Sequence, residues 1–250
     1  MKLVSINIEG DKHWDRVLSF LEQEKPDVLC IQEVFEDDLE KVPNYPQLLF
    51  QPDIKKSHTR GGDPVRFGIA TFSKLPFLTE HLPYYVTNTP ELPLQDTTNE
   101  QTIHDTYRRG YIRVDVEHDD AVYRIINTHF TWTPQGEAAP YQAEDLEALR
   151  ALLKDEDEHV LCGDFNIPRR INPLWARLVE GHTDWIPETV GSSIDLSLHR
   201  HKDNPEIAGR LSAYVVDYLL STPRYRATDV TLKSGVSDHK VIVATILPAE

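Results

Sequence analysis

The first part of the chain most restricts the fold, because an apolar strand, an amphipathic helix and a second apolar strand follow one another closely. Residues 2–8 are typical of a β-strand, and residues 28–31 form a short, entirely apolar run. Between them, one helix face is indicated by four apolar residues at the spacing i, i+3, i+4 and i+7: Trp14, Val17, Leu18 and Leu21. A Lys-Pro-Asp segment at 25–27 ends that helix. The pattern predicts a strand–helix–strand unit whose parallel strands are buried on both faces.

Apolar and β-branched runs separated by turn residues predict further strands along the chain. These runs are residues 66–73, 78–86, 107–116, 121–128, 159–162, 214–220, 227–232 and 240–247. A second helix is expected from Pro140 to Leu153, because proline suits the first helical position and leucines recur on one face; a short helical piece is expected near 172–179. The polar stretches 51–64 and 87–106 are expected to be long loops. The mixture predicts an α+β fold, a single domain over residues 1–250 with two packed sheets and outer helices.

The charge of the chain limits its partners. It carries 26 Lys and Arg residues against 41 Asp and Glu residues, which gives a net charge of −15. That field repels nucleic acid at long range, so we do not expect a high-affinity, non-specific binder of duplex DNA. A local basic pocket that holds a single phosphate remains compatible with it.

Other features of the composition indicate the compartment. The two cysteines, Cys30 and Cys162, exclude a disulfide scaffold and a Cys-rich zinc module. No run approaches the roughly 20 apolar residues of a membrane helix, and the N-terminus turns polar too early for a signal peptide. We therefore expect a cytoplasmic protein without stable membrane association, and no protein partner is evident.

Polar side chains follow or border many of the predicted strands, where a rigid strand positions a side chain on the adjoining loop. They are Asn7, Glu9, Glu33, Asn127, His129, Asp164, Asn166, Asp217, Asp238 and His239. Each alone has an ordinary explanation as a turn or a helix cap, but the whole set at one structural position indicates a site. Carboxylates without Cys or paired His ligands suit Mg²⁺ or Mn²⁺, which bind through one or two carboxylates and substrate phosphate oxygens. With a His–Asp pair and a further Asp as proton acceptor, the set predicts metal-assisted hydrolysis of a phosphate ester.

Seven short motifs occur in a characteristic order along the chain. They are SINIEG (5–10), IQEV (31–34), GIATFSK (68–74), NTHF (127–130), GDFN (163–166), VDY (216–218) and SDH (237–239). The ordered set resembles the endonuclease/exonuclease/phosphatase superfamily, which includes abasic-site endonucleases, deoxyribonuclease I, tyrosyl-DNA phosphodiesterases, inositol-polyphosphate phosphatases and neutral sphingomyelinases. The resemblance covers essentially the whole chain and implies a four-layer α/β/β/α sandwich, with two facing mixed β-sheets and helices on the outer sides.

The resemblance also implies the ligands of the metal. Glu33 matches the principal metal carboxylate, with Asn7 beside it and Glu9 in its outer shell. Asp238 would support the metal or its bound water. The implied cofactor is Mg²⁺, for which Mn²⁺ can substitute.

The remaining motif residues match groups that act on water and phosphate. Asp164 would orient or deprotonate the attacking water, and Asn166 would hold a non-bridging phosphate oxygen. Asp217 would orient His239, which would bind the phosphoryl oxygen in the transition state. His129 resembles the histidine that helps to protonate the leaving group in the deoxyribonuclease and sphingomyelinase branches. Abasic-site endonucleases tend to have a tyrosine there.

Basic and aromatic residues near the motifs are candidates for substrate binding. The resemblance places a phosphate-contacting arginine at Arg109 or its neighbour Arg108. Four basic runs would form a cationic rim if they converge: Lys55-Lys56, Arg108-Arg109, Arg169-Arg170 and the segment 199–202. Trp132 and Trp185 belong either to the core or to the wall of a pocket.

Several functions remain open at this stage. The leading one is a phosphodiesterase or nuclease that hydrolyses a nucleic-acid or nucleotide-like ester. An inositol-phosphate or sphingomyelinase-like lipid phosphoesterase is the alternative, although a lipid-surface enzyme would need an exposed apolar loop and residues 87–105 are polar. A catalytically silent binding module on the same fold is a third reading, but every motif position holds a chemically competent side chain.

Overall fold

The computed structural model describes residues 1–87 and 90–249. Its first sheet has six strands in the order β12-β13-β1-β2-β4-β3. Their bounds are β1 (Lys2–Asn7), β2 (Val28–Phe35), β3 (Gln47–Lys56), β4 (Val65–Ser73), β12 (Tyr225–Lys233) and β13 (Val241–Pro248). β1 and β2 pair in parallel, as the strand–helix–strand pattern predicts, while the other pairs are antiparallel. The sheet is therefore mixed.

The second sheet repeats this plan. Its strands follow the order β10-β11-β9-β8-β7-β5, and β6 pairs with β7. Their bounds are β5 (Phe77–His81), β6 (Tyr84–Val86), β7 (Arg109–His118), β8 (Ala121–His129), β9 (Val160–Asp164), β10 (Thr183–Asp184) and β11 (Asp217–Ser221). β8 and β9 form its parallel pair. Each sheet thus contains one parallel pair, and each pair is connected through a helix.

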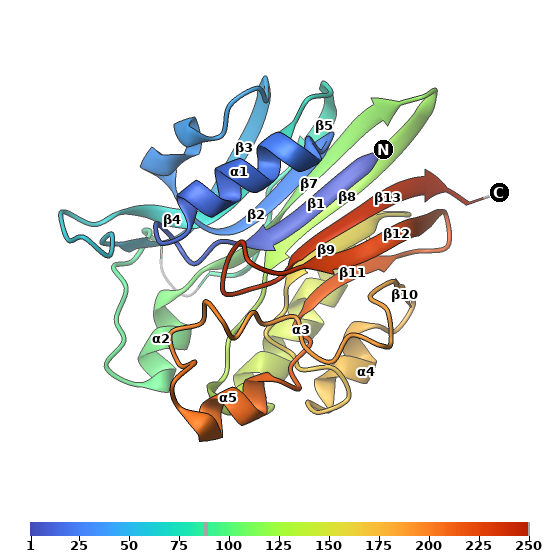
Figure 1. The fold of residues 1–250 in the computed structure, drawn as a ribbon. Coiled ribbons are helices and arrows are strands. Elements are labelled where there is room, and N and C mark those ends of the chain that lie inside the picture. The colour runs from blue at the N-terminus through green and yellow to red at the C-terminus, as the bar shows by residue number, and fades with distance from the viewer. Residues whose placement is uncertain (88–89, 250) are drawn as a thin grey trace.

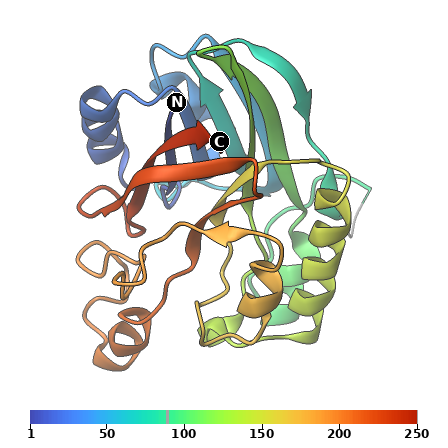
Figure 2. The ribbon, with the colours of Figure 1, turned by 90° about the vertical axis from the view of Figure 1, so that its right-hand side faces the viewer.

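Helices cover the outer faces of the paired sheets (Figures 1 and 2). α1 (Trp14–Glu24) packs Trp14 and Val17 against the outer face of the first sheet. α3 (Pro140–Leu153) covers the second sheet with Leu146, Leu149 and Leu153, and α4 (Leu174–Leu178) lies beside it. The predicted four-layer α/β/β/α sandwich is confirmed.

The polar stretches are more ordered than the sequence indicates. The expectation of a loop from residue 51 is wrong, because β3 continues to Lys56. β3 is an edge strand, where Pro52 and alternating polar residues are tolerated. Within 87–106, α2 (Glu100–Thr106) forms behind an Asn99 capping box, and no residue of this helix is buried. A surface helix without an apolar stripe leaves no periodicity to detect.

Other boundaries shift for local reasons. The strand expected at 78–86 is two strands, β5 and β6, because Leu82-Pro83 interrupts it. The strand expected at 214–220 begins at Asp217, so this carboxylate lies at a strand end rather than inside a strand. Two 3-10 helices, η1 (Glu36–Lys41) and η2 (Pro134–Gly136), and α5 (Pro205–Leu211) complete the elements. Asn204 caps α5 and precedes the proline at its first position.

Two simpler expectations concern cysteines and the membrane. Cys30 and Cys162 are free and fully buried, as expected for small apolar side chains in a core. Among the described residues, no helix combines the length and apolar character needed to cross a bilayer.

Candidate active site

The ends of both parallel pairs meet at one edge of the sandwich. Asn7 ends β1, and its side-chain amide donates to Glu33 Oε1 at 3.2 Å and to Asp164 Oδ2 at 3.0 Å. One buried amide therefore links a carboxylate of the first sheet to a carboxylate of the second. Asn127, also at a strand end, instead bridges the sheets within the core, accepting from Gln32 at 2.7 Å and donating to Ala70 O at 2.9 Å.

A bulge in β2 directs Glu33 into the site. The pairing register of β2 with β4 shifts between Ile31 and Val34, and Glu33 has a φ of 58°. A bulge re-aims one side chain, and a left-handed conformation at a non-glycine residue is a strain that occurs mainly at functional sites. Burial would raise the pKa of Glu33, but Lys56, His129 and the Asn7 hydrogen bond outweigh it and lower the pKa to about 2. Glu33 is therefore negatively charged at neutral pH.

Asp164 depends on the glycine before it. Gly163 has a φ of 142°, and a Cβ there would lie 1.9 Å from Thr128 O, so no other residue fits. Asp164 is only 2% exposed. Burial and the charge of Asp217 raise its pKa, while His239 and His129 offset part of the effect. Asn166, with a φ of 53°, donates its backbone N–H to Asp164 Oδ1 at 2.9 Å and holds that carboxylate in place.

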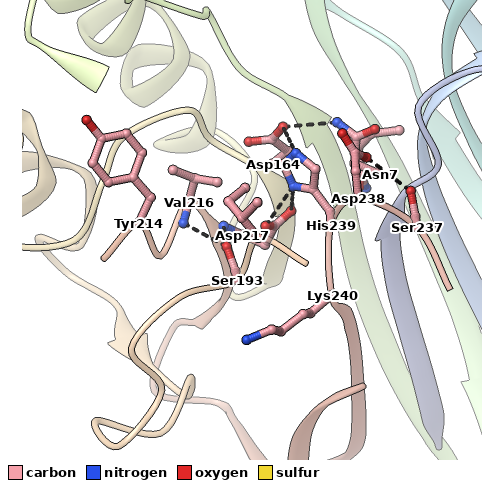
Figure 3. Close-up of polar contacts among 12 residues, drawn as sticks. Asn7, Asp164, Ser193, Tyr214, Val216, Asp217, Ser237, Asp238, His239 and Lys240 are labelled. Carbon is pink, nitrogen blue, oxygen red and sulfur yellow. Dashed lines mark hydrogen bonds and ion pairs between the residues drawn. The ribbon is translucent and has the colours of Figure 1, made fainter. Parts of the chain in front are cut away.

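His239 and Asp217 are in direct contact (Figure 3). Nδ1 of His239 lies 3.0 and 2.9 Å from the two Asp217 carboxylate oxygens, and Nε2 lies 3.9 Å from Asp164 Oδ2. The Asp217 backbone N–H donates to the buried Ser193 hydroxyl at 3.1 Å. Burial would lower the pKa of His239, but the charges of Asp217 and Asp164 raise it well above the usual value. The ring is therefore an imidazolium at neutral pH, with Nε2 turned toward Asp164.

Asp238 lies close to the carboxylate of Glu9, next to the His239–Asp217 pair. Oxygen atoms of Asp238 and Glu9 and a ring nitrogen of His13 lie within 4.8 Å of one another. Burial raises the pKa of Asp238 to about 6, with contributions from the negative charges of Glu9 and Glu33 that His239 only partly offsets. Glu9 is itself paired with Lys12 and His13, so the raised pKa of Asp238 reflects its burial first and the neighbouring carboxylates second. A set of carboxylate oxygens of this kind fits a hard divalent cation.

His129 and Arg109 lie behind the carboxylates. Nε2 of His129 is 3.8 Å from Glu33 Oε1 and 3.7 Å from Asp164 Oδ2. Burial and Arg109 lower the His129 pKa to about 4, so the ring is neutral at pH 7. Arg109 is 4% exposed, donates to the His129 carbonyl at 3.3 Å and stacks 4.4 Å over the Tyr107 ring. Arg109 therefore supports the site from inside.

Arg108 contacts groups that lie away from the candidate carboxylates, and its role in substrate binding stays a prediction. Its guanidinium donates to Pro90 O at 2.7 Å and lies 5.6 Å from the centre of the Tyr84 ring. Successive side chains of an extended segment point to opposite faces, so Arg108 and Arg109 cannot both face the carboxylates.

Of two residues on β3, sequence reasoning missed Asp53 and named Lys56 only as part of a basic run. Asp53 is 1% exposed, its nearest cation is Arg109 at 3.9 Å, and burial raises its pKa to about 8. Lys56, which lies 3.9 Å over the Phe67 ring, supplies the positive charge that most lowers the Glu33 pKa. Their signal was hidden because β3 resembles a polar loop.

The carboxylates open into a cavity of about 340 Å³. Its inner end contains Glu9, Glu33, Asp164, Asn166, Asp238 and His239, and its outer part contains Trp132, Gln135, His199, Arg200, His201, Arg210 and Tyr214. Of the four basic runs, the segment 199–201 lines this cavity, and the charge of Lys56 acts on Glu33. Arg169 instead pairs with Asp184, and Arg170 pairs with Glu188. Trp132 is a wall of the cavity, but Trp185 donates to Ser221 in the second sheet.

A family model describes this combination of fold and motifs. The model of the Endonuclease/Exonuclease/phosphatase family matches residues 4–239, nearly the entire chain. The chain belongs to the endonuclease/exonuclease/phosphatase family. Members of this family are in general hydrolytic phosphoesterases whose fold typically uses a divalent metal, and the acidic clusters of this chain agree with that use.

Solved structures of the family share the fold at low identity. An endonuclease/exonuclease/phosphatase from Beutenbergia cavernae DSM 12333 has a TM-score of 0.73 and 16% identity, covering 100% of this chain and 72% of the other. The 3′ phosphatase NExo from Neisseria, bound to a product DNA hairpin, has a TM-score of 0.68 and 19% identity, covering 99% of each chain. The mannosyl-6-phosphatase Bt3783 of Bacteroides thetaiotaomicron VPI-5482 has a TM-score of 0.63 and 12% identity, also covering 99% of each. No curated protein matches the sequence.

Proposed function

We propose that this protein is a Mg²⁺-dependent phosphodiesterase that hydrolyses a nucleic-acid or nucleotide-like phosphate ester. The observation that carries the proposal is that three ionisable groups with shifted pKa values converge on one cavity. Asp164 is a buried carboxylate of raised pKa, His239 is an imidazolium beside Asp217, and Glu33 is negatively charged at neutral pH. These are a base, a positive charge for the phosphate and a cation ligand.

Glu33, Asp238 and the Asn7 carbonyl oxygen would hold the cation, with Glu9 in its outer shell. When bound, Mg²⁺ or Mn²⁺ would neutralise phosphate charge and so favour attack by water. The position of the buried Asp238 beside the carboxylates of Glu9 and Glu33 supports this assignment, because a cation would offset their mutual repulsion.

The protein groups then divide the reaction between them. Asp164 takes a proton from water while the water oxygen bonds to phosphorus, and Asn166 keeps the carboxylate oriented. His239, held by Asp217, stabilises the negative charge that builds on the phosphoryl oxygens. The P–O ester bond breaks, and the leaving oxygen takes up a proton from solvent. Water and a diester thus yield a phosphate monoester and an alcohol.

The similarity to a DNA 3′ phosphatase supports a nucleic-acid substrate. The similarity to a mannosyl-6-phosphatase means that a sugar phosphate must be tested beside it as an alternative substrate. Residues 90–105 are mostly polar, and Leu94 is their one large apolar side chain that is strongly exposed. A lipid surface calls for a larger exposed apolar face, so this segment disfavours it.

The test is a substrate panel with Mg²⁺, Mn²⁺ or EDTA. It contains single-stranded, duplex and abasic DNA, RNA, a 5′-tyrosyl phosphodiester, an aryl phosphodiester, inositol phosphates, a sugar phosphate and sphingomyelin. We expect cation-dependent cleavage of nucleic acid or the nucleotide-like esters, lost in Asp164→Asn. Asp119→Asn in the β7–β8 hairpin, whose side chain is 88% exposed, is the matched control. Cleavage confined to inositol phosphates, sugar phosphates or sphingomyelin would overturn the proposal, and so would full activity in EDTA.

A further inference from the structure

The outer part of the cavity has a charge opposite to that of its inner end. We call its four basic residues, His199, Arg200, His201 and Arg210, the basic arm. The inner end contains Glu9, Glu33, Asp164 and Asp238. The chain has a net charge of −15, so a cluster of basic side chains on the cavity that also contains the carboxylates differs in charge from the protein as a whole.

The basic arm is fixed relative to the candidate catalytic residues. The backbone N–H of Asp195 donates to Asp238 O at 2.7 Å, and that of Lys240 donates to Ser193 O at 2.7 Å. The N–H of His199 in turn donates to Asp195 O at 3.1 Å. These bonds tie the segment that carries His199 to the loop that carries His239.

The part of the basic arm that lies on α5 is tied down as well. Arg210, on α5, donates to the Gln135 side chain at 2.7 Å, and the Tyr214 hydroxyl donates to the Gln135 carbonyl. Residues from α5 and η2 therefore meet across the cavity and give it a defined outer end.

The charges of the basic arm are largely unneutralised. Across residues 1–87 and 90–249, the Arg200 side chain makes neither a hydrogen bond nor an ion pair, and the carboxylate nearest to Arg210 is Glu206 at 3.9 Å. Burial and the charges of His239, His201 and Arg200 lower the pKa of His199 to about 4. By contrast, Arg124 and Arg177 lie 2.9 and 2.6 Å from carboxylate oxygens. At pH 7 the positive charge of the basic arm therefore comes from its arginines, because His199 is neutral. Arg200 has no counter-charge among the described residues, and Arg210 has only Glu206 at 3.9 Å.

We propose that the basic arm binds a second phosphate of the substrate, adjacent to the phosphate that is hydrolysed. The inference rests on the proposed function and narrows its substrate class to nucleotide esters with an additional phosphate, as in an oligonucleotide. Charge-assisted contacts from arginine suit phosphate oxygens. The rings of Trp132 and Tyr214 line the same cavity and favour a nucleotide, because bases stack on aromatic side chains.

The kinetic test compares two chromogenic substrates, the p-nitrophenyl ester of thymidine 5′-phosphate and the same ester with an added 3′-phosphate. We expect the 3′-phosphate to raise kcat/KM about tenfold, since contacts to charged groups reach that magnitude. The ratio of the two kcat/KM values should fall toward one in Arg200→Gln and in Arg200→Gln/Arg210→Gln. Arg226→Gln is the matched control, because Arg226 is exposed on β12 and pairs with Leu247, far along β13 from Val241.

A binding measurement separates this inference from the proposed function. Calorimetry in EDTA compares thymidine 3′,5′-bisphosphate, thymidine 5′-monophosphate and inositol trisphosphate. We expect the bisphosphate to bind about tenfold more tightly than the monophosphate, with the difference lost in Arg200→Gln.

Equal kcat/KM values for the two esters and equal affinities for the two nucleotides would overturn the proposal that the basic arm binds a second phosphate. The proposed function would remain intact. Tight binding of the bisphosphate without hydrolysis of either ester would overturn the proposed function. It would support phosphate binding by the basic arm. Tighter binding of inositol trisphosphate than of the bisphosphate would overturn the nucleotide assignment.

Discussion

Glu33 and Asp164 occupy equivalent places in the two halves of the molecule, yet their chemistry is opposite. Each lies on the second strand of a parallel pair, β1-β2 or β8-β9, whose strands are joined through a helix. The pKa of Glu33 falls to about 2, whereas that of Asp164 rises. The topology therefore places the carboxylates, and their surroundings decide what each one does.

The difference has a local cause. The Glu33 side chain is 25% exposed and lies near the positive charge of Lys56. Asp164 is almost completely buried and faces the negative charge of Asp217. One carboxylate is suited to hold a cation, and the other is suited to accept a proton. Each prediction below breaks or sharpens this contrast.

The largest effect should come from Asp164→Asn. An amide cannot accept the proton of the attacking water, so we expect kcat to fall about 10³-fold, and raising Mg²⁺ should not restore it. Steady-state kinetics over a wide Mg²⁺ range test this, with Asp119→Asn as the control. Recovery at high Mg²⁺ would show that Asp164 is a metal ligand like Glu33, and the contrast would fail.

The dyad beside Asp164 should have the next largest effect. His239→Ala is expected to lower kcat about 10²-fold or more, and Asp217→Asn should lose much of the same activity. Because the two residues act as a unit, the double variant should cost little more than the worse single variant. Rates that multiply in the double variant would show two independent residues.

Glu33→Gln should act through the metal instead. We expect activity at low millimolar Mg²⁺ to fall about 10- to 100-fold and to recover partly as Mg²⁺ increases, because an amide is a poor ligand for a hard cation. Glu144→Gln, an exposed change on α3, should leave the Mg²⁺ dependence unchanged. A loss independent of Mg²⁺ would remove Glu33 from the metal site.

Without metal, Glu33→Gln and Asp164→Asn should change the free energy of unfolding in opposite directions. The lowered pKa of Glu33 means that its contribution is present above pH 4.5 and is lost as the pH falls toward 2, so Glu33→Gln destabilises at pH 7. The raised pKa of Asp164 means that stability is lost as the pH rises from 3.8, the ordinary value, to the raised pKa, so Asp164→Asn stabilises at pH 7. We expect Glu33→Gln to cost about 1–3 kcal/mol at pH 7 and Asp164→Asn to raise the free energy of unfolding, with both differences shrinking in acid. Denaturant unfolding in EDTA from pH 3 to 7 measures both, and equal signs at pH 7 would refute the electrostatic account.

The smallest effect concerns salt. If the basic arm and the candidate catalytic groups are the main phosphate contacts, DNA binding should involve about two to four phosphates, with a slope of about −0.9 per phosphate on duplex DNA. A plot of log affinity against log salt concentration measures it, using catalytically inactive Asp164→Asn protein. A slope near −8 would indicate an extended basic groove.

The main elements of the candidate site could be predicted from sequence because their signals are local. Asn7, Glu33 and Asp164 each stand where an apolar run gives way to polar residues, and short motifs accompany them. The apolar runs themselves determine the strands, because burial of alternating or continuous apolar side chains is a property of the segment. The sequence by itself therefore determined the two-sheet fold and most of the candidate catalytic set.

What the sequence could not determine depends on neighbours that are distant along the chain. Arg109 rather than Arg108 turns toward His129 because of the side-chain alternation at the start of β7. The charge of Lys56 acts on Glu33 because β3 and β2 both pair with β4. The raised pKa of Asp164 follows from its burial and from the charge of Asp217, which the pairing of β9 with β11 brings beside it. The tertiary structure alone decided these features, because burial and charge–charge distances arise only when separate segments pack together.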